Sequence, residues 1–226
     1  MKLLIKEGAN FNVDARQGGL YIKALRAAVS HGRVGVAEIL LKAATKVDRP
    51  EERDGILAHA VRPGHELLVN ALLDNGVKVS EQALQEASQE GLYDITSTLL
   101  KWIPDGDKIP YCNNALLEAS KWRRFDIAQM LIENGAKADA RDAGGNSALS
   151  MAAVSGEERI CKLLLSKGAS FEVDSSGHHL FSKVWNVKVI RLMPLDDFEL
   201  NFVREKVLSA LQEVNLTFRT RFSKKL

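Results

Sequence analysis

The chain has 226 residues, of which 46% are hydrophobic and 27% charged, and this composition excludes a disordered protein. Its 31 basic and 29 acidic side chains leave a formal charge of +2, which gives no overall attraction to nucleic acid or to a membrane. Two cysteines, Cys112 and Cys161, are too few for a disulfide framework, so we expect a reducing compartment, the cytoplasm or the nucleus. No apolar run approaches the roughly 20 residues of a membrane-spanning helix.

One short pattern returns five times along the chain. Each copy has a leucine, an alanine three residues later, a glycine four residues after that, and then a pair of large aliphatic residues. The lead leucine recurs after 32, 27, 32 and 33 residues, and the fourth copy has Arg123 in place of the glycine. One such unit buries too little apolar surface to be stable alone, so the pattern predicts a stacked array. The lead leucines are Leu25, Leu57, Leu84, Leu116 and Leu149.

In chain order, residues 1–13 hold the second half of a unit, and about five whole units follow up to residue 174. Each unit is expected to contain an alanine-rich first helix and a leucine-rich second helix. The glycine between them suits a left-handed turn. A further glycine ends the second helix, as at Gly76, Gly135 and Gly168. We therefore expect helix–turn–helix units joined by short hairpin-like fingers.

Two connections depart from this pattern. Between Gly76 and Ser80 there is no room for a full hairpin, and Ser80 is expected to cap the next helix. Residues Ile103–Tyr111 contain two prolines and are expected to form a turn-rich finger. Asp105 and Asp107 in that segment suggest calcium, but the glycine at position six and the glutamate at position twelve of an EF-hand loop are absent, which favours a plain turn.

The last copy carries the most specific motif, Asp142-Ala-Gly-Gly145-Asn-Ser147-Ala148-Leu149. This motif resembles the Asp-x-x-Gly-x-Thr-Pro-Leu turn of the ankyrin repeat, a unit of about 33 residues. TPR and HEAT repeats are the alternatives, but their helices are longer and they lack a Gly-Ala helix ending followed by such a turn. The resemblance covers roughly residues 1–174 and implies an all-α ankyrin-repeat solenoid.

Residues 175–226 leave the repeat pattern. We expect a degenerate capping unit, a C-terminal helix over residues 196–216 and a basic tail. Phenylalanines interleaved with basic residues in the tail can bind phosphate or bases, but a frayed terminus or a junction to a missing domain is favoured. Because residues 1–13 lack a first helix of their own, we also expect the chain to be a fragment or alternative product of a longer protein.

No set of residues with catalytic spacing is present. His178 and His179 are adjacent, but no cysteine or acidic residue lies near them at a spacing typical of metal ligands. Nothing brings Cys112 and a histidine together as nucleophile and base, and Gly18-Gly19 is not followed by the lysine and hydroxyl residue of a phosphate-binding loop. We therefore expect neither an enzyme nor a cofactor or metal.

The resemblance implies a binding surface, because ankyrin-like arrays bind partners with their finger tips and the ends of their first helices. A large aromatic residue at a normally polar position makes Trp122 a candidate hot spot, although packing over a neighbouring finger is the alternative. The basic residues suggest that this chain, as a monomer, binds a protein of acidic character. The alternative interpretation is that the chain is a regulatory or targeting part of a larger signalling protein or enzyme. The candidate residues are Arg16, His31, Arg49, Arg62, Glu90, Tyr111, Lys121, Trp122 and Arg141.

Overall fold

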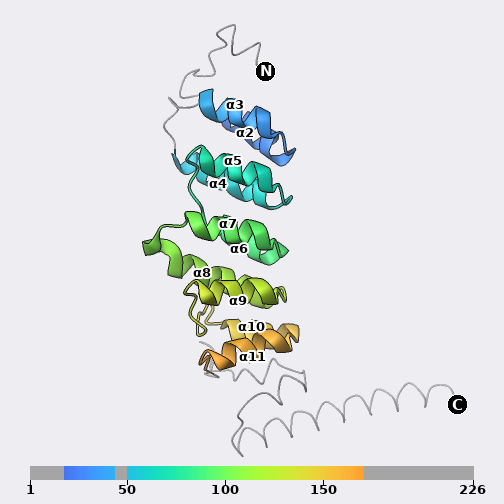
Figure 1. The fold of residues 1–226 in the computed structure, drawn as a ribbon, viewed down its shortest axis with the longest axis vertical. Helices are drawn as coiled ribbons and strands as arrows, with labels where there is room; N and C mark the ends of the chain where they lie inside the picture. Colours follow the sequence, from blue (N-terminus) through green and yellow to red (C-terminus); the bar gives the residue numbers. More distant parts are fainter. Residues whose placement is uncertain (1–17, 44–49, 171–226) are drawn as a thin grey trace, which may run out of the picture.

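The computed structural model describes residues 18–43 and 50–170, in which ten helices form five pairs stacked in one row (Figure 1). The expected all-α stack is confirmed. The first helices of the pairs are α2 (Gly18–Ser30), α4 (Pro50–Val61), α6 (Glu81–Glu90), α8 (Asp105–Lys121) and α10 (Ala148–Ser155). The second helices are α3 (Val34–Ala43), α5 (Glu66–Asp74), α7 (Tyr93–Trp102), α9 (Phe125–Glu133) and α11 (Glu158–Ser166).

The core is a continuous strip between neighbouring pairs. First helices pack against first helices and second helices against second helices along the row. The alanine three residues after each lead leucine is buried, and its small side chain lets neighbouring first helices approach closely. Because each pair contacts the pairs before and after it, the strip has the linear organisation of a solenoid. All five lead leucines are fully buried: Leu25, Leu57, Leu84, Leu116 and Leu149.

The turns inside the pairs have the left-handed backbone that their glycines predict. The φ angles are 63° at Gly32, 73° at Gly64, 83° at Gly91 and 75° at Gly156. Among the described residues, Arg123 is the sole non-glycine residue with a positive φ, at 63°. The fourth turn therefore keeps the backbone of the other four with an arginine in the place of the glycine.

The expectation of a turn-rich finger over Ile103–Tyr111 is wrong. Helix α8 begins at Asp105 and runs for 17 residues, with Pro110 inside it. The acidic side chains of its first turn favour a helix N-terminus, and its later turns are fixed by buried residues such as Cys112 and Leu116. Pro110 removes a single backbone donor, which this packing outweighs. By contrast, Ser80 caps α6 as expected, and its Oγ accepts from the Ala83 amide at 3.3 Å.

One finger lies among the described residues, between α9 and α10. An isolated antiparallel bridge pairs Arg141 with Ser147, and the Asp142 carboxylate accepts from the Asn146 amide at 2.8 Å. Burial raises the pKa of Asp142, but the hydrogen bonds from Asn146 and from the Gly144 backbone outweigh it and hold that pKa below its ordinary value. This finger is thus a hairpin-like turn closed by an aspartate. The expected half unit at 1–13 and the expected helix and tail beyond residue 174 lie outside the described residues.

Candidate protein-binding surface

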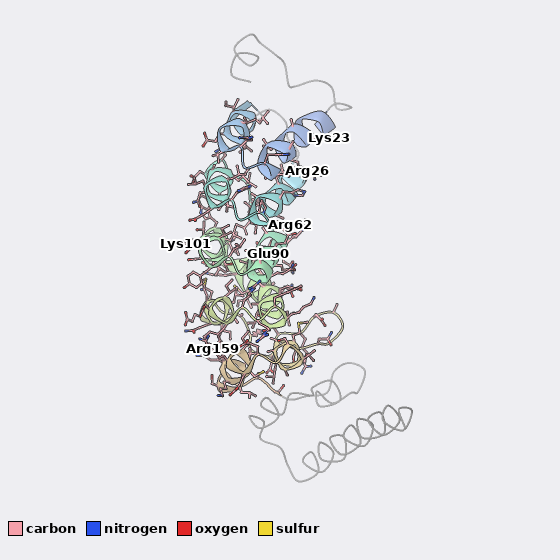
Figure 2. The ribbon with its side chains drawn as sticks, turned by 90° about the vertical axis from the view of Figure 1, so that its right-hand side faces the viewer. Lys23, Arg26, Arg62, Glu90, Lys101 and Arg159 are labelled. Atoms are coloured by element: carbon pink, nitrogen blue, oxygen red, sulfur yellow. The ribbon has the colours of Figure 1, made fainter. Side chains whose placement is uncertain are left out.

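The ends of the first helices form a row that we call the first-helix surface. It is defined by the exposed residues at or just after the ends of α2, α4, α6 and α8. Figure 2 shows Arg62 and Glu90 on the column of first helices, with Lys23 and Arg26 of α2 further along the same column. The candidate residues that the structure places on this surface are His31, Arg62, Glu90, Lys121 and Trp122.

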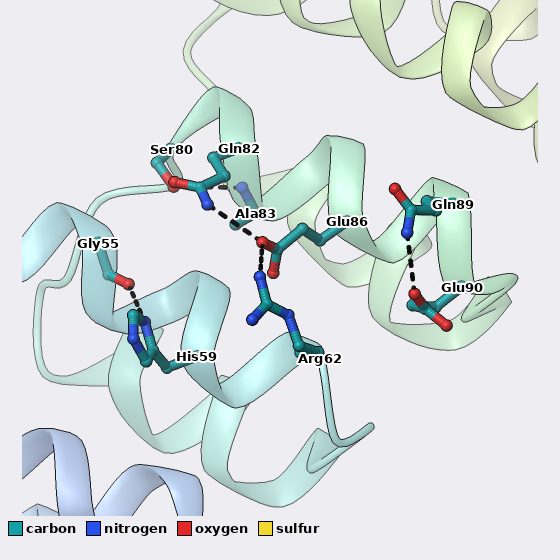
Figure 3. Close-up of polar contacts among 9 residues, drawn as sticks. All are labelled: Gly55, His59, Arg62, Ser80, Gln82, Ala83, Glu86, Gln89 and Glu90. Atoms are coloured by element: carbon teal, nitrogen blue, oxygen red, sulfur yellow. Dashed lines mark hydrogen bonds and ion pairs between the residues drawn. The ribbon is translucent and has the colours of Figure 1, made fainter.

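Arg62 is oriented by a carboxylate of the next repeat. Its Nη2 donates to Oε1 of Glu86 at 2.7 Å, and Nε2 of Gln82 donates to the same oxygen at 3.1 Å (Figure 3). The Arg62 side chain is 70% exposed, whereas that of Glu86 is 14% exposed. The ion pair therefore holds the guanidinium at the surface from a mostly buried anchor. It also joins α4 to α6 across the repeat boundary.

Trp122 directly follows α8 and is held by a contact with the last turn of that helix. Its indole Nε1 donates to Oε2 of Glu118 at 3.1 Å, and the Nζ of Lys121 lies 5.8 Å from the centroid of the indole ring. The residue is nevertheless 46% exposed. A fixed aromatic ring of this exposure offers contact area with little loss of conformational entropy on binding.

The other candidates lie elsewhere. Tyr111 lies on α8 rather than on a finger, and it is half-buried against the core. Arg141 is also half-buried, and its Nη1 donates to the Gly145 carbonyl within the finger at 3.1 Å. Arg16 and Arg49 lie outside the described residues. The structure thus gathers five of the nine candidates on the first-helix surface.

Sequence reasoning missed Glu86 and Glu118, the carboxylates that orient Arg62 and Trp122. The signal for Glu118 was present, because it lies four residues before Trp122 on one helix face. The pair of Arg62 and Glu86 has no local signal, since the two residues are 24 positions apart and meet only when the repeats stack.

Both thiols are buried, which decides their chemistry. Burial raises the pKa of Cys112 to about 11 and that of Cys161 to about 12. At neutral pH the thiols therefore stay protonated and are poor nucleophiles.

Within the described part of the chain, no three histidine, cysteine, aspartate or glutamate side chains come together as a group that could hold a metal ion. Nor does any described helix have the length and apolar character needed to span a bilayer.

The stacked pairs, the left-handed turns and the hairpin-like finger define a helix–turn–helix solenoid. Residues 84–175 match the family model of the ankyrin repeats, in three copies. The chain also resembles the crystal structure of the human ASB11 ankyrin repeat domain with a TM-score of 0.67 and 22% identity, over 86% of this chain and 92% of that one. No curated protein sequence matches this chain. Residues 84–175 are therefore ankyrin repeats by their match to the family model, and the described fold is that of an ankyrin repeat domain. Ankyrin repeats are general protein–protein interaction modules, typically without catalytic activity.

Proposed function

We propose that this protein is a non-catalytic scaffold that holds a partner protein against its first-helix surface. The observation that carries the proposal is the exposed indole of Trp122, oriented by Glu118 and flanked by Lys121. Hot spots of protein interfaces are enriched in such aromatic anchors. Trp122 is the residue on which we expect the binding free energy to depend most.

We further propose that the partner presents acidic groups to α2 and α4. The exposed basic residues Lys23, Arg26 and Arg62 lie on the same column of helices (Figure 2). A basic row of this kind speeds the encounter with an acidic surface and makes it sensitive to salt. Glu90 faces the same side on α6, so we place the acidic part of the partner against the first two repeats. Binding should weaken as salt is raised.

The experiment compares wild type with Trp122→Ala and with the matched control Trp102→Ala. Trp102 is 49% exposed but lies at the end of the second helix α7. Proteins cross-linked to the wild-type chain in cells are identified, and the affinity of each purified protein is then measured against all three chains. Trp122→Ala should lower the affinity by about 2 kcal/mol, roughly 30-fold, whereas Trp102→Ala should leave it unchanged. Equal losses for the two variants would contradict the proposed surface.

We also propose that the protein works as a monomer in the cytoplasm or the nucleus. The support is that Cys112 and Cys161 are free thiols buried in the core, as suits a reducing compartment. Sedimentation of the purified chain should give the mass of one chain, and a fluorescent fusion should show the two compartments. A stable dimer or secretion would contradict this part of the proposal.

A further inference from the structure

A groove of about 630 Å³ lies beside the turns of the third, fourth and fifth repeats. We call it the arginine groove. Figure 2 shows Arg159, one of its lining residues, on the column of second helices, whereas Arg62 and Glu90 lie on the column of first helices. The groove therefore extends onto the second-helix side of the stack, and it borders the first-helix surface where Arg123 follows Trp122. Its basic and apolar lining residues include Tyr93 of α7, Arg123 and Arg124 of the turn before α9, Phe125 and Met130 of α9, and Arg159 of α11.

Three guanidinium groups line this groove, and each is held by one contact. Nε of Arg124 donates to the Gln89 carbonyl at 3.0 Å, and Nε of Arg123 donates to Oε2 of Glu157 at 3.3 Å. Cζ of Arg159 lies 3.8 Å from the centroid of the Phe125 ring. A guanidinium has five N–H donors, so the Nη groups of Arg123 and Arg124 stay available. Among the described residues these Nη groups have no hydrogen-bond partner.

The backbone of Arg123, in the lining of the arginine groove, has an unfavourable conformation. Its φ of 63° lies in the left-handed region, where the Cβ of an L-residue crowds the neighbouring carbonyl. The other four turns have glycine there, followed by Arg33, His65, Leu92 and Glu157. Strained residues persist where the surrounding structure holds them, and they gather at functional sites. The two consecutive arginines thus occur at a turn where one of them is conformationally unfavourable.

The groove also contains acidic side chains, and these limit what it can bind. Asp126, Glu133 and Glu157 are in the lining, and these carboxylates would repel a doubly charged phosphoryl group more strongly than a singly charged carboxylate. A single carboxylate carries less charge, and its plane matches the guanidinium fork. Tyr93, Phe125 and Met130 provide apolar surface beside the arginines.

We propose that the arginine groove is a second docking site, which binds an aspartate or glutamate side chain of a partner protein next to a large apolar residue of the same peptide segment. The carboxylate would lie between the Nη groups of Arg123 and Arg124. The apolar residue would pack on the exposed ring of Tyr93, beside the Phe125 ring that Arg159 covers. The proposal does not depend on Trp122 or on the first-helix surface.

The test uses a displayed library of random peptides, selected on the full chain. Peptides that bind wild type but not the Arg123→Gln/Arg124→Gln variant are sequenced, synthesised and measured by fluorescence anisotropy. They should carry aspartate or glutamate beside a large apolar residue, and glutamine in place of that acid should weaken binding at least about tenfold. The matched control is Arg33→Gln, which removes the same charge one residue after the turn glycine of the first repeat. It should change the affinity less than about twofold.

Arg123→Gly separates the docking role from a structural one. Glycine relieves the left-handed strain, so the fold should be kept while the affinity for the selected peptides falls about fivefold or more. Undiminished affinity in both Arg123→Gly and Arg124→Gln would overturn the proposal, as would a selection without enrichment of acidic residues. A phosphoserine version of a selected peptide that binds better than the glutamate version would overturn the choice of a carboxylate.

Discussion

Arg123 and Glu157 connect the turns of two successive repeats, with Nε of the arginine 3.3 Å from Oε2 of the glutamate. Arg123 stands where the other turns have glycine, and Glu157 directly follows the turn glycine Gly156. Equivalent residues of earlier repeats make the same approach without an ion pair to the turn residue. If Gly32 carried a Cβ, that atom would lie 2.9 Å from the ring of His65. A Cβ on Gly91 would lie 3.0 Å from Nε of Arg124. In the second to fifth repeats, the residue after the turn therefore covers the turn of the repeat before it.

This contact predicts that substitutions of glycines with a left-handed backbone differ in how much they destabilise the protein. Gly91→Ala meets both a left-handed φ and the Arg124 side chain, whereas Gly76→Ala has a similar φ of 78° with nothing within 4 Å of its Cβ. The φ angle alone should lower the free energy of unfolding by about 1–2 kcal/mol in each variant. Gly91→Ala should lose more, because Arg124 must also give way. Urea unfolding followed by circular dichroism measures the free energy of unfolding of both variants. Equal losses would show that the contact of Arg124 with Gly91 does not affect stability.

Arg123→Gly should not destabilise the protein. The substitution removes left-handed strain of about 1 kcal/mol, and it removes an ion pair whose arginine side chain is 61% exposed. Exposed pairs contribute about 0–1 kcal/mol, so the free energy of unfolding should stay level or rise. Glu157→Gln, which removes the pair and keeps the strain, is the control and should be slightly less stable than wild type. A clear loss of stability in Arg123→Gly would mean that the arginine holds the two repeats together.

The close approach of the first helices predicts the effect of Ala152→Leu. Ala152 is fully buried on α10, which packs on α8. A leucine there overpacks the contact and should lower the free energy of unfolding by about 1–3 kcal/mol. The control is Val154→Ala on the same helix, because Val154 is exposed and surface substitutions usually stay within about 0.5 kcal/mol. If both variants unfold at the wild-type urea concentration, Ala152 does not face the neighbouring repeat.

The sequence predicted those features that repeat within each unit. Lead leucines, small alanines and turn glycines follow a local spacing, and the structure places them as that spacing requires. The first turns of α8 were missed because Pro110 suggests a turn, whereas the burial of Cys112 and Leu116 decides the conformation. The pair of Arg62 and Glu86 depends on how adjacent repeats stack, and no local pattern carries that information. The binding role of Trp122 remains a prediction, because the residues that orient it say nothing about what it contacts in a partner.

The two buried thiols predict a loss of stability at alkaline pH. Burial raises the pKa of Cys112 to about 11 and that of Cys161 to about 12, whereas an unfolded cysteine titrates near about 8.5. The unfolded state therefore loses these protons first as the pH rises. The protonated thiols make their full contribution to the free energy of unfolding below about pH 8.5. Above that pH each thiol should lower the free energy of unfolding by about 1.4 kcal/mol per pH unit, until its pKa in the folded protein is reached. Urea unfolding at pH 7.5 and 10 measures this loss against the Cys112→Ala/Cys161→Ala variant, which keeps every other titratable side chain. Parallel losses in both proteins would contradict the prediction.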